Sequence, residues 1–135
     1  MTPPHHKIFL HGIDDMPRLH AFFNACQRDM QLSPQNLAEL SVIADEVVSN
    51  IFLHNRARVE VILVARRKGK QINLHVEDTG IPFNFLDAPE IAVDLPLEER
   101  EVGGLGILLA RSLSDEIRYR YDKHKNRLTI IKEVD

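Results

Sequence analysis

The spacing of hydrophobic residues changes along the chain from a helical period to a strand period. Between residues 14 and 54 apolar positions recur every three or four residues, which predicts two consecutive helices. Residues 58–67 and 71–78 have the pattern of strands, and the second run alternates apolar and polar side chains at every position. Further along, residues 105–113 predict a short helix, and residues 116–121 and 127–134 predict two more strands.

Turn and cap residues place the expected boundaries of these elements. A short strand from residue 7 would stop at Gly12, and Asp14 or Asp15 would cap the first helix, with Pro17 in its first turn. The second helix would have Ser33 as its N-cap and a proline at its first position. The Lys-Gly-Lys at 68–70 predicts a hairpin turn.

These elements predict a two-layer α/β sandwich. Strands joined by hairpins form an antiparallel or mixed sheet, and three amphipathic helices would cover one of its faces. A chain of 135 residues is large enough to bury a core as one domain, residues 1–135.

Two polar residues interrupt the otherwise apolar second helix. Glu46 and Asn50 are four residues apart, so they lie on one helix face. An unpaired buried charge costs several kcal/mol, even after the surroundings relax. We expect these side chains either to face a ligand or to be a structural pair satisfied by backbone groups.

Four of the six glycines lie in two short stretches that suggest a nucleotide site. Gly103, Gly104 and Gly106 come directly before the short helix, where free backbone N–H groups bind anions such as phosphate. Asp78 ends a strand two residues before Gly80, so its carboxylate could accept a hydrogen bond from the amine of adenine, with Gly80 leaving room for the flat base. The alternative is that the glycines punctuate loops and that Asp78 forms a turn.

Composition and charge narrow the function. The net charge of −3 provides no basic field for direct nucleic-acid binding. The single cysteine, Cys26, excludes an internal disulfide and fits a reducing compartment, and no apolar run is long enough for a signal peptide or a membrane span. We therefore expect a cytoplasmic protein, with Cys26 in the core.

The motifs taken in order resemble one superfamily. The Glu-x-x-x-Asn helix, the Asp-x-Gly at a strand end, the Gly-Gly-x-Gly that opens a helix and the closing strand pair are similar to the Bergerat-fold ATPases, which include histidine kinases and DNA gyrase. The chain is most similar to the anti-sigma-factor serine-protein kinases, over about residues 7–134. The resemblance implies a mostly antiparallel, mixed sheet with helices on one face.

The resemblance also implies a role for each candidate residue. Glu46 would be the general base that accepts the proton of a serine hydroxyl, and Asn50 would hold a Mg²⁺ ion that bridges the ATP phosphates. Asp78 would bind the adenine amine, supported by Thr129 on the final strand. The phosphates would be wrapped by Gly103, Gly104, Leu105 and Gly106. His54 would contact phosphate, or would only pack or cap the helix end.

The function implied is that of an ATP-dependent serine kinase that is also a binding protein. Members of this family sequester a sigma factor and phosphorylate a serine of an anti-anti-sigma antagonist, and a homodimer is possible. Two alternatives remain. One is a non-catalytic interaction module that binds ATP or nothing, and the other is an ATP-hydrolysing fragment of a DNA-repair or topoisomerase-like machine. The absence of a following domain disfavours the last.

Overall fold

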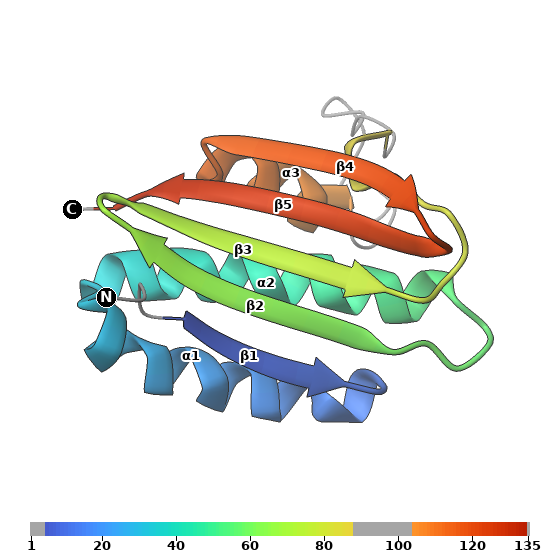
Figure 1. The fold of residues 1–135 in the computed structure, drawn as a ribbon, viewed down its shortest axis with the longest axis horizontal. Coiled ribbons are helices and arrows are strands. Elements are labelled where there is room, and N and C mark those ends of the chain that lie inside the picture. Colours follow the sequence, from blue (N-terminus) through green and yellow to red (C-terminus); the bar gives the residue numbers. More distant parts are fainter. Residues whose placement is uncertain (1–4, 88–103, 135) are drawn as a thin grey trace.

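The computed structural model describes residues 5–87 and 104–134, which form two layers. Five strands make one sheet, and three helices pack on one of its faces (Figure 1). The strands are β1 (His5–Leu10), β2 (Val61–Lys68), β3 (Gln71–Asp78), β4 (Glu116–Asp122) and β5 (Lys125–Glu133). The helices are α1 (Met16–Met30), α2 (Pro34–His54) and α3 (Gly104–Leu113), and two single-turn 3₁₀ helices are Ile13–Asp15 and Phe85–Asp87. This arrangement confirms the predicted two-layer α/β sandwich.

The sheet has the order β1-β2-β3-β5-β4, and each neighbouring pair is antiparallel. The mixed pairing that the sequence left open is therefore not found among the described strands. β3 lies at the centre, and its last residue, Asp78, pairs with Val61 of β2 on one side and with Asn126 of β5 on the other. The sheet order thus puts Asp78 beside the first residues of β5.

Local chemistry explains where the helices begin. Ser33 caps α2 as predicted, because its Oγ accepts a hydrogen bond from the main-chain N–H of Asn36 at 3.1 Å. Asp15 stands at the cap position of α1, but its carboxylate accepts from the main-chain N–H of His11 at 2.7 Å and makes no cap bond to α1. The carboxylate therefore closes the turn before the helix.

The core lies between the sheet and the helices. It is built from the inward residues of the strands and the apolar faces of α1 and α2, and Cys26 is fully buried within it, as expected. Burial, with a smaller effect from Asp29, raises the pKa of the Cys26 thiol to about 12, which makes it unreactive. The last turn of α2 is open to solvent, where Leu53 is 76% exposed.

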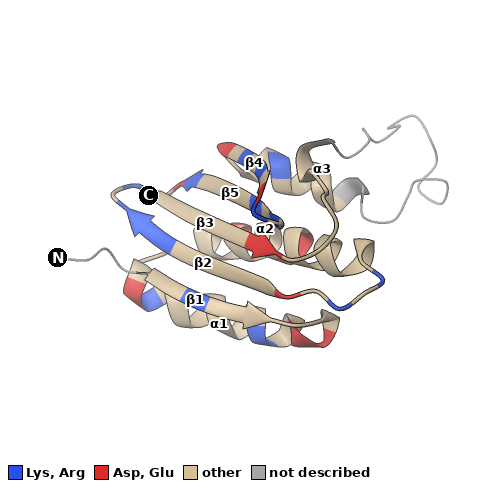
Figure 2. Cartoon of the chain, turned by 45° about the vertical axis from the view of Figure 1, so that its right-hand side comes forward, with Lys and Arg blue, Asp and Glu red and all other residues tan. Residues whose placement is uncertain are grey.

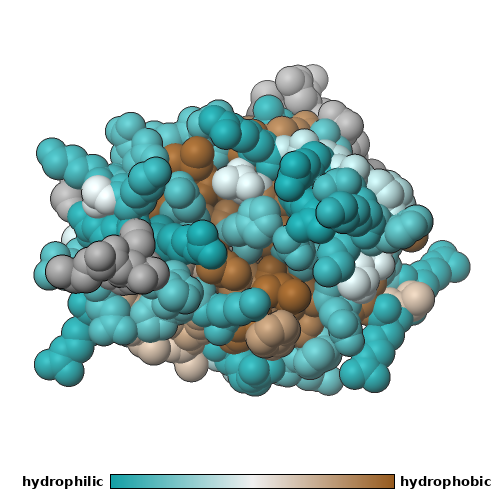
Figure 3. Space-filling view, in the orientation of Figure 1, coloured by the Kyte–Doolittle hydropathy of each residue, from teal (hydrophilic) through white to brown (hydrophobic). Residues whose placement is uncertain are grey.

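The opposite face of the sheet carries polar side chains with apolar ones between them (Figure 3). Acidic and basic residues are intermingled over both layers (Figure 2).

Within the described part of the chain, no helix combines the length and the apolar character needed to cross a membrane.

Candidate nucleotide-binding site

Asn50 is 8% exposed and lies in the wall of a pocket at the C-terminal half of α2. Its Nδ2 donates a hydrogen bond to the main-chain oxygen of Glu46 at 2.7 Å. The alternative that backbone groups satisfy this side chain therefore holds for Nδ2 of Asn50, which bonds to its own helix. This bond also fixes the amide so that Oδ1, the atom that could bind a cation, is the end that the helix does not use.

Glu46 lies one turn earlier, against the first turn of α3. A methyl group built on Gly106 would stand 1.8 Å from Oε2 of Glu46 and 2.1 Å from its Cδ. Only a residue without a side chain fits there while Glu46 keeps this position. The fold thus brings together the predicted base and the last glycine of the cluster, although Glu46 is not among the residues that line the pocket.

The environment of Glu46 disfavours its charge. Partial burial, and secondarily the neighbouring carboxylate of Asp45, raise the pKa of Glu46 above its ordinary value. A raised pKa makes a carboxylate a stronger base, which suits a group that must take a proton.

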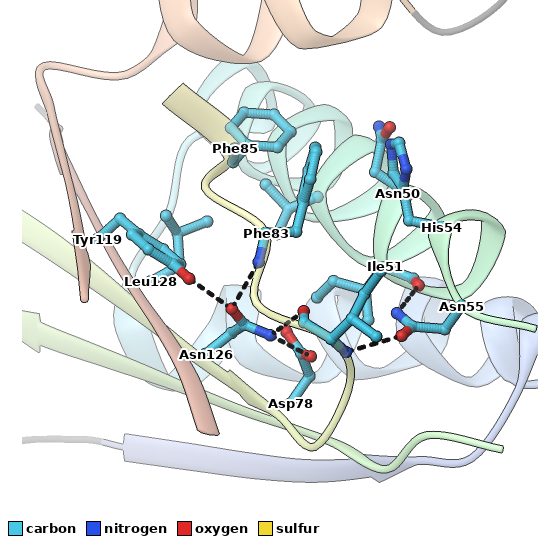
Figure 4. Close-up of a pocket in the computed structure, with 12 residues that line it drawn as sticks. Asn50, Ile51, His54, Asn55, Asp78, Phe83, Phe85, Tyr119, Asn126 and Leu128 are labelled. Carbon is cyan, nitrogen blue, oxygen red and sulfur yellow. Dashed lines mark hydrogen bonds between the residues drawn. The ribbon is translucent and has the colours of Figure 1, made fainter. Parts of the chain in front are cut away.

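The pocket is narrow and opens to solvent. Three of the predicted site residues, Asn50, His54 and Asp78, line this one pocket, together with aromatic rings from the loop after β3 and from β4 (Figure 4). Most ligand pockets combine such an apolar lining with a few placed polar groups. The described structure therefore brings side chains that are distant in the sequence into one pocket.

Asp78 is a buried carboxylate, 6% exposed, at the end of β3. Its Oδ1 accepts two hydrogen bonds, from the main-chain N–H of Gly80 at 2.9 Å and from Nδ2 of Asn126 at 3.0 Å. Burial raises the pKa of Asp78, and these two bonds partly oppose the rise. The bond from Gly80 forms the turn that the alternative interpretation of Asp78 predicts. It occupies Oδ1 of Asp78 and does not involve Oδ2.

Contact with Asn55 is one reason why residue 80 is a glycine. A Cβ at this position would stand 2.5–2.8 Å from the side-chain amide of Asn55. That amide is held in place, because Nδ2 donates to the main-chain oxygen of Ile51 at 2.7 Å and Oδ1 accepts from the N–H of Ile81 at 2.9 Å. The space that a side chain at position 80 would need is thus filled by Asn55, and the role of Gly80 beside a flat base stays a prediction.

His54 lies at the end of α2 with its ring stacked on Phe83. The two ring centroids are 4.1 Å apart and the planes differ by 27°. Of the two roles considered for His54, packing is the one that this contact supports.

The placement of Thr129 corrects the sequence-based expectation. Its hydroxyl is 3.1 Å from Nδ1 of His75 on the face of the sheet away from the helices, so it does not reach the edge of Asp78. Side chains alternate along a strand, and on β5 the neighbouring residue, Leu128, is the one that lines the pocket.

The glycine cluster is described only in part. Gly103 lies outside the described residues, Gly104 begins α3, and nothing is described of the side chain of Leu105. Gly106 is the member whose contacts are known, and these are with Glu46.

The sequence interpretation missed two asparagines that shape the pocket, Asn55 and Asn126. Asn126 had a detectable signal, because it stands two and four residues before the inward Leu128 and Ile130. A buried polar residue in an inward position needs a partner, and here that partner is Asp78. Asn55, at the end of a helix, has no comparable signal in the sequence.

Comparison with known proteins agrees with the fold. The family model described as "Histidine kinase-like ATPase domain" matches residues 12–132. Proteins named "Anti-sigma F factor" from two strains of Clostridium kluyveri are 28% identical over 108 residues, which covers 77% of this chain and 76% of each relative. The catalytic domain of the histidine kinase ThkA superposes with a TM-score of 0.53 over 96% of this chain and 97% of that one, at 9% identity, a level that shows the fold alone.

Proposed function

Because the chain belongs to the histidine kinase-like ATPase domain family, we propose that it binds ATP in the pocket between α2 and the paired ends of β3 and β5. The observation that carries this proposal is the buried carboxylate of Asp78 in a pocket that Asn50 and His54 also line. The match to the Clostridium anti-sigma F factors supports the predicted branch of the family.

The donor set fits an adenine nucleotide. Carboxylate oxygens only accept hydrogen bonds, and the exocyclic amine of adenine is a donor, so Asp78 is matched to that edge of the base. Neither bond that Asp78 receives from Gly80 and Asn126 ends on Oδ2, and this is the oxygen that we assign to the amine. The aromatic rings of Phe83 and Tyr119 provide apolar surface in the same pocket.

Asn50 is the residue that we assign to Mg²⁺, through its amide Oδ1. Among the described residues, no group of three or more His, Cys, Asp or Glu side chains is arranged to hold a metal ion. A cation held by one protein oxygen takes its remaining ligands from phosphate and water, which is how Mg²⁺ is usually bound at nucleotide sites. When bound, it would neutralise phosphate charge.

We further assign to Glu46 the role of general base toward a serine hydroxyl of a protein substrate. Its raised pKa and its place one turn from Asn50 support this role. The partners that we propose are a sigma factor and a serine-bearing antagonist of the anti-sigma activity, by analogy with the relatives' name. The output would be control of transcription by exchange of partners.

One observation favours a second candidate function. Glu46 lies beneath Gly106 and outside the pocket lining, an arrangement that would also suit a domain that binds nucleotide without transferring phosphate. The two functions share the ATP site and differ in whether phosphate reaches a serine.

Calorimetry with ATP, with and without Mg²⁺, tests the shared part. We expect Asp78→Asn to lower the affinity for ATP by about ten- to a hundredfold, since a hydrogen bond to a charged group contributes about 1.5–3 kcal/mol. The matched control is Asp14→Asn, at an exposed aspartate of the turn before α1. Wild-type protein that is folded and does not bind ATP at millimolar concentration would refute the proposal. Phosphate transfer from labelled ATP to a candidate antagonist then separates kinase from binding module.

A further inference from the structure

Asn126 is a buried asparagine of β5, 5% exposed, whose side chain joins this strand to three other segments around the pocket. Its Oδ1 accepts hydrogen bonds from the N–H of Phe83 at 3.0 Å and from the hydroxyl of Tyr119 at 2.6 Å. Its Nδ2 donates to Oδ1 of Asp78 at 3.0 Å and to the main-chain oxygen of Ile81 at 2.8 Å (Figure 4). The network thus ties together β4, β5, the end of β3 and the loop that follows it.

These contacts determine which way the amide of Asn126 faces. Two donors, a peptide N–H and a phenol, meet its oxygen, while a carboxylate and a carbonyl meet its nitrogen. If the amide turned over, its oxygen would face the carboxylate of Asp78 and its NH₂ group would face the N–H of Phe83. Each of those pairs is repulsive, so the N–H of Asn126 is committed to Asp78.

We propose that Asn126 is the positioning residue for purine recognition, holding Asp78 as an acceptor-only carboxylate with Oδ2 presented to the exocyclic amine of adenine. This inference rests on the proposed ATP site and concerns which purine that site accepts. Asn126 acts through Asp78.

The chemistry of the two purines explains the selectivity. Adenine presents an amine at the position where guanine presents a carbonyl oxygen, so an ionised Asp78 attracts the first and repels the second. A protonated Asp78 could donate to the guanine oxygen, and the distinction would weaken. Burial raises the pKa of Asp78 while the bonds from Asn126 and Gly80 lower it, so losing Asn126 favours the protonated form.

Other titratable groups near Asp78 are few among the described residues. His54 of α2 and Tyr119 of β4 line the same pocket, and the hydroxyl of Tyr119 bonds to Asn126. Directly before β2, the exposed Glu60 precedes Val61, the residue that pairs with Asp78. On β5, Arg127 faces the other side of the sheet, where it contacts Glu77. A pH effect of Asn126 is therefore measured as a difference between the variant below and the wild type, since both proteins contain these groups.

The test compares Asn126→Ala with Thr129→Ala, a control on the same strand that faces away from the pocket. Calorimetry would measure the affinities for ATP and for GTP as a function of pH, and a thermal melt would show that each variant is folded. We expect Asn126→Ala to bind ATP about tenfold or more weakly at neutral pH, as for loss of a charge-assisted hydrogen bond. We also expect its preference for ATP over GTP to fall and its loss of ATP binding in acid to begin at higher pH, while Thr129→Ala behaves as wild type.

Different failures have different meanings. Wild-type protein that binds no adenine nucleotide would overturn the proposed function and this inference with it. Wild-type protein that binds ATP, together with a folded Asn126→Ala that keeps the wild-type affinity, purine preference and pH profile, would overturn this inference alone.

If Asn126→Ala does not fold, the wild-type protein still provides the test. The side-chain amide protons of Asn126 and the carboxyl carbon of Asp78 can be followed by NMR during a pH titration. If Asn126 donates to the carboxylate, its amide resonances should shift with the same midpoint as the Asp78 carbon. An Asn126 amide that does not respond to the ionisation of Asp78 would overturn the inference.

Discussion

Glu46 carries its carboxylate in a place where ionisation is unfavourable. Partial burial and the adjacent Asp45 raise its pKa, so the folded protein binds this proton more tightly than the unfolded chain does. Below the pKa that Glu46 has in the unfolded chain, its carboxyl group is neutral in both states and does not affect the free energy of unfolding. As the pH rises through the folded-state pKa, the ionised form destabilises the fold.

We therefore expect Glu46→Gln to be at least as stable as the wild type at neutral pH. Glutamine has nearly the same shape and no charge, so it removes the cost of ionisation. Its advantage should disappear as the pH is lowered toward the ordinary pKa of a glutamate. Thermal melts of both proteins across that range would measure this. A mutant that melts well below the wild type at neutral pH would show that Glu46 is there for the fold.

The same substitution should abolish most phosphate transfer if Glu46 is the base. We expect the rate to fall by about 10²–10⁴-fold, the usual contribution of a positioned general base, with ATP affinity within a few fold of wild type. Asp45→Asn is a matched control on the next residue, whose carboxylate lies 3.0 Å from Nε2 of His20. It should keep transfer at neutral pH, and because it removes a neighbouring charge, activity should persist to lower pH. Equal rates for Glu46→Gln and wild type would exclude the role.

At the scale of elements, the contact between α2 and α3 depends on Gly106. Glycine inside a helix is less favourable than alanine by about 1 kcal/mol, so Gly106 lowers the intrinsic stability of α3. The carboxylate of Glu46 occupies the place where a Cβ would stand, which explains why a better helix former is not used. A glycine at position 106 is thus required for Glu46 of α2 to keep its present position.

We expect Gly106→Ala to separate stability from activity. The obstructed atoms are at the end of a flexible side chain, so Glu46 can move aside and the fold should survive, with little change in melting temperature. The carboxylate would leave its present position, and transfer should fall at least tenfold, as expected when a reacting group is misplaced by about 1 Å. Alanine at Gly12, which has open space around it, is the matched control. Unchanged transfer in Gly106→Ala would show that the position of Glu46 is not catalytic.

Local patterns were sufficient to predict the elements and their layers. The cap at Ser33, the turn at Gly69 and the alternation in β3 are properties of neighbouring residues, and each is found where the sequence places it. The cap of α1 was predicted less well, because a carboxylate such as Asp15 can bond to either side of a turn.

The sequence predicted those features of the site that arise within a single helix or strand, but not those that depend on how two strands pair. The spacing of Glu46 and Asn50 and the position of Asp78 follow from a helix and a strand end. The partners of Asp78 depend on the register between β3 and β5, which pairs it with Asn126. No pattern within either strand specifies that register, so the partner of Asp78 was not predicted. The alternation within β5 does indicate that Asn126 faces inward and Thr129 outward, and this signal was not used.

At the scale of the whole molecule, the pocket is closed by chain segments that are far apart in sequence. Asp78 and Asn126 are separated by 48 residues, and α3 with its preceding segment lies between them in the chain. Pairing of β3 with β5 must therefore close a long loop, and such non-local contacts form slowly, late in folding.

This separation has a consequence for the kinetics of folding. A pocket completed by β3–β5 pairing is absent from a transition state in which that pairing is not yet made, so nucleotide has nothing to bind there. Its stabilisation of the native state, RT ln(1 + [L]/Kd), should then appear almost entirely as slower unfolding. Stopped-flow refolding and unfolding in denaturant, with and without Mg-ATP, would measure both rates. We expect the refolding rate to be unchanged, and a nucleotide that accelerates refolding would show that the two strands meet before the barrier is crossed.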